Sequence, residues 1–126
     1  MDFNPMAPIW VQVVTRIKGE IIRGVLPPGA KMPGGRELAL QYAINPNTAA
    51  RVYKELEQQG LCETRRGLGT YVTADEQRIL ALRHEQAALA ADTYLRFLAE
   101  MGMDTDDAVR LIREKEQPAK EENEHA

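Results

Sequence analysis

The sequence has little that would support a disulfide framework, a metal centre or a membrane span. Its 126 residues include one cysteine, Cys62, and two histidines, so no intramolecular disulfide can form and no metal-ligand spacing is present. No apolar run approaches the roughly 18 to 20 residues that a transmembrane helix needs, and the first residues lack the basic and apolar regions of a secretory signal. We therefore expect a cytoplasmic protein without metal or cofactor.

Catalytic signatures are equally scarce. We find no nucleophile–base pair and no Walker-type phosphate loop, and the pattern Gly67-Leu68-Gly69 is too short to indicate one. Aromatic residues make up 6% of the chain. Trp10, Tyr42, Tyr53 and Tyr71 lie at apolar positions of their expected elements, which favours a place in the core over base stacking. We expect a protein that is not an enzyme.

The formal net charge of −3 is unevenly distributed. Residues 1–73 contain nine Lys/Arg and six Asp/Glu, whereas residues 74–126 contain seven and thirteen. Binding to a polyanion depends on the local potential, so a basic first part is compatible with nucleic acid. The excess is small, and a solvated charged surface would show it too.

Helical spacing predicts a first helix from about Pro8 to Arg23, with Ile9, Val13, Ile17 and Ile21 on one face. A connection rich in proline and glycine follows over 24–35, and we expect it to be fixed by stiffness rather than by secondary structure.

The next segment predicts a helix-turn-helix. A short helix is expected over 36–43 and a second over 46–59, with Asn45 as N-cap and Pro46 at the first helical position. The second helix has an apolar inward face, formed by Ala49, Val52, Tyr53 and Leu56, and its opposite face is polar and basic. These outer residues are Asn47, Ala50, Arg51, Lys54 and Gln58.

A β-hairpin is predicted directly after these helices. The segment 61–66 forms one strand, 67–69 the turn and 70–73 the returning strand, with Arg65 and Arg66 near the tip. A hairpin in this place is the wing of a winged helix. Cys62 is expected to be a small buried core residue rather than a redox sensor.

The remaining residues predict two further helices. A long helix ends near Gly102, a second begins at Asp104, and residues 118–126 read as a disordered acidic tail. We thus expect a mostly α-helical α+β chain with a winged helix-turn-helix domain (1–73), a two-helix dimerisation domain (74–117) and a tail (118–126). The apolar residues expected to pair two copies are Ile79, Leu82, Leu89, Leu95, Leu98, Met101, Leu111 and Ile112. The alternative is that the two helices fold back on their own first domain.

Several ordered motifs resemble the N-terminal domain of GntR-family transcriptional regulators over residues 8–73. They are Pro8-Ile9-Trp10, the segments 24–33 and 36–39, Asn45-Pro46-Asn47-Thr48, the segment 56–61 and the segment 67–72. The two C-terminal helices are similar to the small second domain of the YtrA-like subfamily. The resemblance implies a cytoplasmic homodimeric repressor that binds a palindromic operator, often beside genes of membrane transporters, and a small-molecule effector is possible.

The resemblance and the positions of the cations give one predicted DNA-binding set. Asn47 and Arg51 are assigned to base edges, whereas Thr48 could bond to a phosphate, the helix start or a base. The set comprises Arg36, Asn45, Pro46, Asn47, Thr48, Arg51, Lys54, Arg65, Arg66, Gly67 and Gly69.

Two features depart from the family pattern. Gly34-Gly35 replaces a serine and an acidic residue, which removes a possible phosphate contact, and Ala50 occupies a position that is often basic or polar. The alternative function is a protein-interaction module with the same fold and no DNA binding. In that case, Arg51 and the wing arginines could be replaced without consequence.

Overall fold

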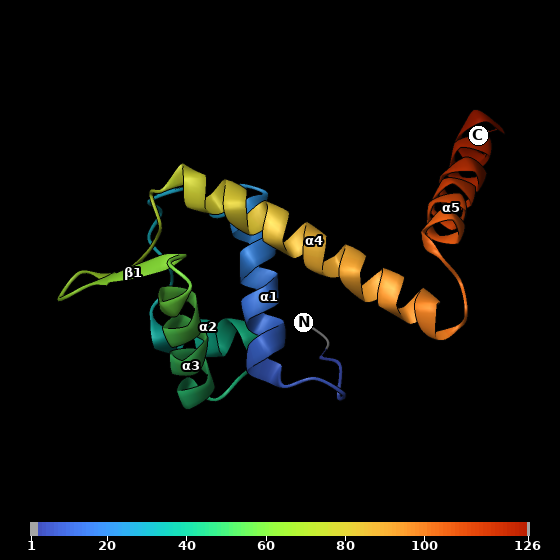
Figure 1. Cartoon of the computed structure of the whole chain (residues 1–126). Coiled ribbons are helices and arrows are strands. Elements are labelled where there is room, and N and C mark those ends of the chain that lie inside the picture. Colours follow the sequence, from blue (N-terminus) through green and yellow to red (C-terminus); the bar gives the residue numbers. More distant parts are fainter. Residues whose placement is uncertain (1–2, 126) are drawn as a thin grey trace. The chain divides into compact units, whose positions relative to one another are not determined.

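The computed structural model describes the backbone of residues 3–125 and the side chains of residues 3–116. The chain divides into two compact units, Met1–Arg83 and His84–Ala126, and each is described by itself. The elements are α1 (Ile9–Ile22), α2 (Gly35–Tyr42), α3 (Pro46–Gln58), β1 (Cys62–Arg65), β2 (Gly69–Val72), α4 (Glu76–Glu100) and α5 (Thr105–His125) (Figure 1). This is the mostly helical winged-helix architecture that the sequence predicts.

The core of the first unit forms where α1, α2 and α3 meet. From α1 it takes Val13, Val14, Ile17 and Ile21, all nearly inaccessible to solvent, as helical spacing requires for one buried face. The prediction for Ile9 is wrong, because this residue lies at the start of α1 and its side chain is 45% exposed.

The helix-turn-helix prediction is confirmed in its details. The helix α2 ends at Tyr42, and its C-cap Ala43 has a φ of 54° in the left-handed region, after which the chain turns into α3. The side-chain Oδ1 of Asn45 accepts a hydrogen bond from the backbone N–H of Asn47 at 2.7 Å. The buried face of α3 is the predicted one: Ala49, Val52, Tyr53 and Leu56.

The wing is an antiparallel hairpin with a third segment at its edge. Strand β1 pairs with β2 from Cys62–Val72 to Arg65–Gly69. The connection before α2 also pairs with β2: Met32 N–H donates to the carbonyl of Thr70 at 2.7 Å, and Val72 N–H donates to that of Ala30 at 2.8 Å. Sheet hydrogen bonds therefore hold a connection that we expected to depend on stiffness alone, since Met32 is buried and the edge of β2 is open to pairing.

The first unit extends further along the chain than the predicted boundary at residue 73. The side chain of Leu82 is fully buried in its core, and Ile79 packs against that core. Nε of Arg78 donates to the carbonyl of Gln59 at 2.9 Å. The prediction that Leu82 serves dimerisation is therefore corrected, because its side chain completes the core of its own unit. Ile79 is only partly buried there, and its role in dimerisation stays a prediction.

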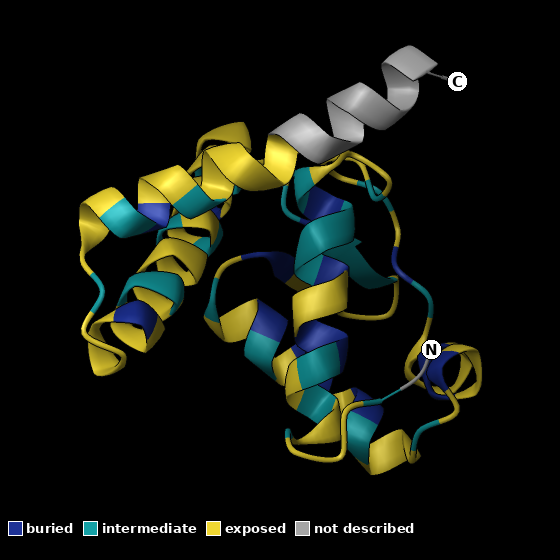
Figure 2. Ribbon diagram, turned by 90° about the vertical axis from the view of Figure 1, so that its right-hand side faces the viewer, coloured by how far each residue is buried: buried dark blue, intermediate teal, exposed yellow. Residues whose placement is uncertain are grey.

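The second unit contains the rest of α4 and α5. Leu98 and Ala108 are its buried hydrophobic residues among those described, and the hydroxyl of Tyr94 donates to the carbonyl of Ala108 at 3.3 Å. Figure 2 shows how little of this unit is buried compared with the first. The predicted cap is present, because Asp104 Oδ1 accepts from the N–H of Asp107 and Asp107 Oδ2 from that of Asp104.

Helix α5 continues through residue 118 to His125, where we expected a disordered tail from residue 118. Residues 119–122 are alanine, lysine and two glutamates, which are strong helix formers, and this preference prevails over Pro118. Residue 126 lies outside the described residues.

Candidate nucleic-acid interface

Helix α3 presents one polar, basic face opposite its buried one. Arg51 and Lys54 are exposed on it together with Asn47, Ala50 and Gln58. All five face away from the core, as the spacing predicts. A single helix face with two exposed cations fits the phosphate-lined wall of a DNA groove.

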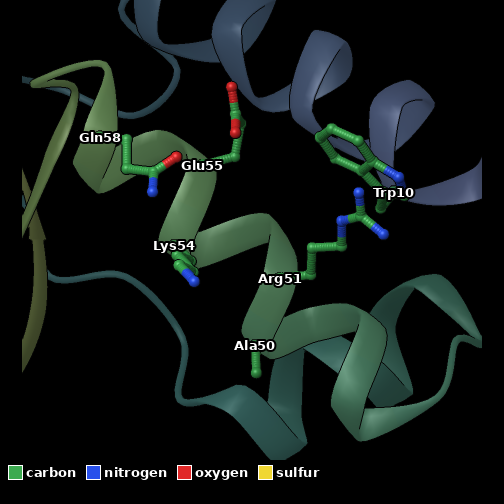
Figure 3. Close-up of a pocket in the computed structure, with 6 residues that line it drawn as sticks. All are labelled: Trp10, Ala50, Arg51, Lys54, Glu55 and Gln58. Carbon is green, nitrogen blue, oxygen red and sulfur yellow. The ribbon is translucent and has the colours of Figure 1, made fainter.

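Arg51 is held by an aromatic ring from α1. Its guanidinium carbon lies 4.2 Å from the centroid of the Trp10 ring, a cation–π contact. The two side chains line a surface hollow of about 480 Å³ together with Lys54 and Glu55 (Figure 3). Trp10 is only partly buried, so its expected place in the core is confirmed for one side of the ring only.

At the start of α3, some residues form the helix N-terminus, whereas others have side chains that are available for contact with DNA. The side-chain oxygen of Asn45 is used by the helix cap, and Pro46, at the first helical position, has no N–H to donate. Thr48 is half-buried, whereas Asn47 is exposed. Among the described residues, none bonds to the Asn47 side chain, which leaves its amide able to reach a base edge.

Arg36 lies in the first turn of α2 and is exposed. Gly34, the N-cap, provides no side-chain hydrogen bond. The hydroxyl of Tyr53 on α3 donates to the carbonyl of Pro33 in the connection before α2, which ties this connection to α3. Burial raises the pKa of this tyrosine, so the hydroxyl remains a donor.

The two wing arginines are not equivalent. Arg65 donates to Glu63 Oε1 through NH2 at 2.8 Å and Nε at 3.1 Å, and its guanidinium stacks 4.3 Å from the Tyr71 ring centroid. Arg66 is exposed in the turn, and no ion pair or hydrogen bond engages it within the described part of the chain. Arg66 is thus the readier of the two to meet a phosphate.

A hydrogen bond joins the wing to α3. The hydroxyl of Thr64 on β1 donates to the carboxylate of Glu57 on α3. This bond therefore links the strand that leads to the wing arginines with the helix that bears the basic face.

The two glycines of the predicted set have a backbone role. Gly67 has φ 78° and Gly69 has φ 120°, values that other residues rarely adopt. A Cβ on Gly69 would lie 3.1 Å from Cε of Lys31. Both glycines shape the tip of the wing, and the structure gives no further reason to place them against DNA.

Lys31 is a cation that the sequence reasoning missed. It is exposed, it pairs with Tyr71 across the sheet edge, and its side chain lies against Gly69. It also lines a hollow of about 710 Å³ beside the start of α2. Only the pairing of residues 30–32 with β2 brings it to the wing, and no local sequence signal indicates that pairing.

Other site chemistries find no support among the described residues. They contain no group of three His, Cys, Asp or Glu that could hold a metal ion, and none of their helices is long and apolar enough to cross a bilayer. Cys62 is buried, and that burial raises the pKa of its thiol to about 12. The thiol therefore stays protonated, which agrees with its expected role as a core residue.

The helix-turn-helix, its exposed basic helix and the arginine-bearing wing define a winged helix-turn-helix DNA-binding protein. Residues 10–72 match the family model described as bacterial regulatory proteins, gntR family. The chain belongs to the GntR family of transcriptional regulators, which bind DNA.

Two relatives from Bacillus subtilis are similar over different lengths. The HTH-type transcriptional regulator YhcF is 32% identical over 112 residues, which cover 89% of this chain and 93% of YhcF. The HTH-type transcriptional repressor YtrA is 40% identical over 80 residues, covering 64% and 62% respectively. Both alignments cover more residues of this chain than the family model, which matches residues 10–72.

Solved structures give the same family. A GntR-family transcriptional regulator from Listeria monocytogenes superposes with a TM-score of 0.83 at 31% identity, covering 89% of this chain and 98% of that one. The DNA-binding domain of AraR, solved in complex with its operator ORX1, reaches a TM-score of 0.54 at 30% identity, covering 58% and 93%.

Proposed function

We propose that this chain is a homodimeric transcriptional repressor that binds a palindromic operator through α3 and the wing. The observation that carries the proposal is the exposed basic face of α3, on which Arg51 and Lys54 stand beside Asn47. Support for repression comes from the similarity to YtrA, which is named a repressor. Its working place would be the bacterial cytoplasm, where operators are accessible.

The test is a titration of the full chain into a labelled DNA fragment from upstream of its own gene, followed by anisotropy at several salt concentrations. An unrelated fragment runs alongside, with the variants Arg51→Ala and Arg96→Ala. Arg96 is an exposed arginine of α4 in the second unit, so its variant controls for the loss of one positive charge.

We expect specific binding that weakens with salt, because bound cations displace counterions from phosphates. Arg51→Ala should reduce specific binding, and Arg96→Ala should leave it close to that of the parent chain. Equal, weak binding of all proteins to both fragments would refute the proposal in favour of a protein-interaction module.

The second unit supports the homodimer. Its buried hydrophobic residues are few, while Leu89, Phe97, Met101 and Ile112 are each more than half exposed. Tyr94, Leu111 and Ile112 line an apolar hollow of about 560 Å³. We propose a second copy as its occupant, because like surfaces can bury one another about a two-fold axis and present two α3 helices to two half-sites.

The regulated genes are a further part of the proposal. Through the similarity to YtrA-like regulators we propose membrane-transporter genes as targets, and genome-wide mapping of bound DNA would test this. A small-molecule effector would act by changing the spacing of the two recognition helices. Titration with metabolites that leave operator affinity unchanged would argue against it.

A further inference from the structure

We propose that Trp10 is a positioning residue for DNA recognition, because its indole ring holds Arg51 with the guanidinium edge directed at a base. This inference rests on the proposed contact between Arg51 and the operator. It adds a residue of α1, outside the helix-turn-helix, to the determinants of base preference.

The contact with Trp10 leaves the N–H donors of the Arg51 guanidinium group available. The central carbon of the group lies over the Trp10 ring, 4.2 Å from the ring centroid. The N–H donors lie in the plane of the group and point outward from its edge. An arginine held over a ring by a cation–π contact can therefore still offer the donor pairs with which it binds guanine O6 and N7.

Arg51 has a competing partner on its own helix. Glu55 lies four residues further on α3 and lines the same hollow, a spacing at which opposite charges attract each other on a helix surface. No ion pair joins Arg51 to Glu55 in the described chain, and Figure 3 shows Arg51 turned toward Trp10 while Glu55 points away from it. Arg51 thus contacts the ring rather than Glu55, whose Oε1 accepts a hydrogen bond from Nε2 of Gln59 at 2.8 Å.

Trp10 is suited to this task by its own anchoring. It lies in the first turn of α1 and packs partly against the core. A fixed ring restrains a side chain that otherwise loses considerable rotamer freedom when it binds. The expected consequence is sharper discrimination at one base pair in each half-site, with a smaller effect on overall attraction to DNA.

The experiment is a selection from a duplex library with 20 randomised base pairs, sequenced before and after binding to the full chain. The proteins are the parent chain, Trp10→Tyr, Trp10→Leu, Arg51→Ala and the double variant Trp10→Leu/Arg51→Ala. A matched control, Ile22→Ala, removes a partly buried residue from the same helix and the same core without touching Arg51. Circular dichroism confirms that each variant is folded at the selection temperature.

We expect Trp10→Leu to lose about fivefold or more of the preference at the position where Arg51→Ala loses it, which is the lower end for one bidentate contact. Trp10→Tyr should retain most of the preference, since it keeps an aromatic face. The double variant should match Arg51→Ala, because Trp10 acts through the arginine.

Three results would overturn the inference. They are an unchanged preference in Trp10→Leu, a loss of the same size in Ile22→Ala, or additive losses in the double variant. If Arg51→Ala retains the base preference of the parent chain, the base contact proposed for Arg51 is refuted, and the inference about Trp10 with it. A motif selected by the parent chain would in that case still support sequence-specific DNA binding. If the parent chain selects no motif, the proposed function fails.

Discussion

At the scale of single residues, the turn between α2 and α3 contains one conformation that its residue does not favour. Ala43 has φ 54°, and the left-handed region costs an L-residue roughly 1–2 kcal/mol because its Cβ approaches the following carbonyl oxygen. Its side chain is exposed, so removing the methyl group creates no cavity.

We therefore predict that Ala43→Gly stabilises the protein. The free energy of unfolding should rise by about 0.5–1 kcal/mol, since the relief of strain is partly offset by the greater freedom of glycine in the unfolded chain. Thermal denaturation followed by circular dichroism measures the change. Ala81→Gly, at an exposed position inside α4, is the matched control and should destabilise by up to about 1 kcal/mol. A fall in stability for Ala43→Gly would contradict the strain argument.

The second prediction at this scale concerns Cys62. Burial, and then the charge of Glu57, raise the pKa of its thiol from 9.0 to about 12. Because the folded state holds the proton more tightly, its contribution to stability is complete below pH 9 and is lost as the pH rises toward 12. Cys62→Ala should therefore lose less stability than the parent chain between pH 9 and pH 11 in urea titrations. Parallel losses in the two proteins would refute this assignment, as would a native thiol that reacts with a disulfide reagent at pH 8 as fast as the unfolded one.

At the scale of elements, the N-terminus of α3 combines a structural role with a proposed role in binding DNA. Asn45 caps the helix by accepting from the N–H of Asn47. Asparagine and aspartate are comparable caps, whereas alanine is a poor one. The pair Asn45→Ala and Asn45→Asp can thus separate helix stability from DNA contact.

We predict that Asn45→Ala lowers the free energy of unfolding by about 1 kcal/mol, while Asn45→Asp leaves it close to that of the parent chain. In DNA titrations the order should reverse at this position: the aspartate variant binds more weakly than the alanine variant, because its carboxylate would face the phosphates. Urea denaturation and anisotropy provide the two measurements. Equal DNA affinity for the two variants would place residue 45 away from the duplex.

The same elements show what could be predicted from the sequence. The buried face of α3 follows from periodicity, and the cap at Asn45 follows from local chemistry, so both were predictable. Leu82 was assigned to dimerisation because an apolar residue on an amphipathic helix does not reveal which surface it will cover. The edge pairing of Lys31 with Tyr71 and the contact between Trp10 and Arg51 also went unpredicted. Each joins residues some 40 positions apart, a separation at which neither spacing nor propensity carries information.

At the scale of the whole molecule, the division of the apolar residues between the two units bears on assembly. At the start of α4, Leu82 belongs to the core of the first unit and Ile79 packs against that core. The second unit has exposed hydrophobic residues on both of its helices, among them Phe97 on α4 and Ile112 on α5. Unpaired surfaces of this kind are uncommon on monomers. Pairing two copies through the second unit would explain why a small unit retains them.

We predict that Ile112→Asp converts the proposed dimer to a monomer at micromolar concentration. The side chain is 52% exposed and lines the apolar hollow of the second unit, so the substitution adds a charge to the proposed interface without unfolding the first unit. Light scattering should give half the parent mass. The affinity for a two-half-site operator should fall by about tenfold or more, since the two recognition helices would no longer bind as one linked pair. Val25→Asp, at an exposed apolar position of the first unit, should leave mass and affinity unchanged. If the Ile112→Asp variant is dimeric and binds with full affinity, the interface does not include Ile112. If the parent chain is monomeric, the proposed dimer is refuted.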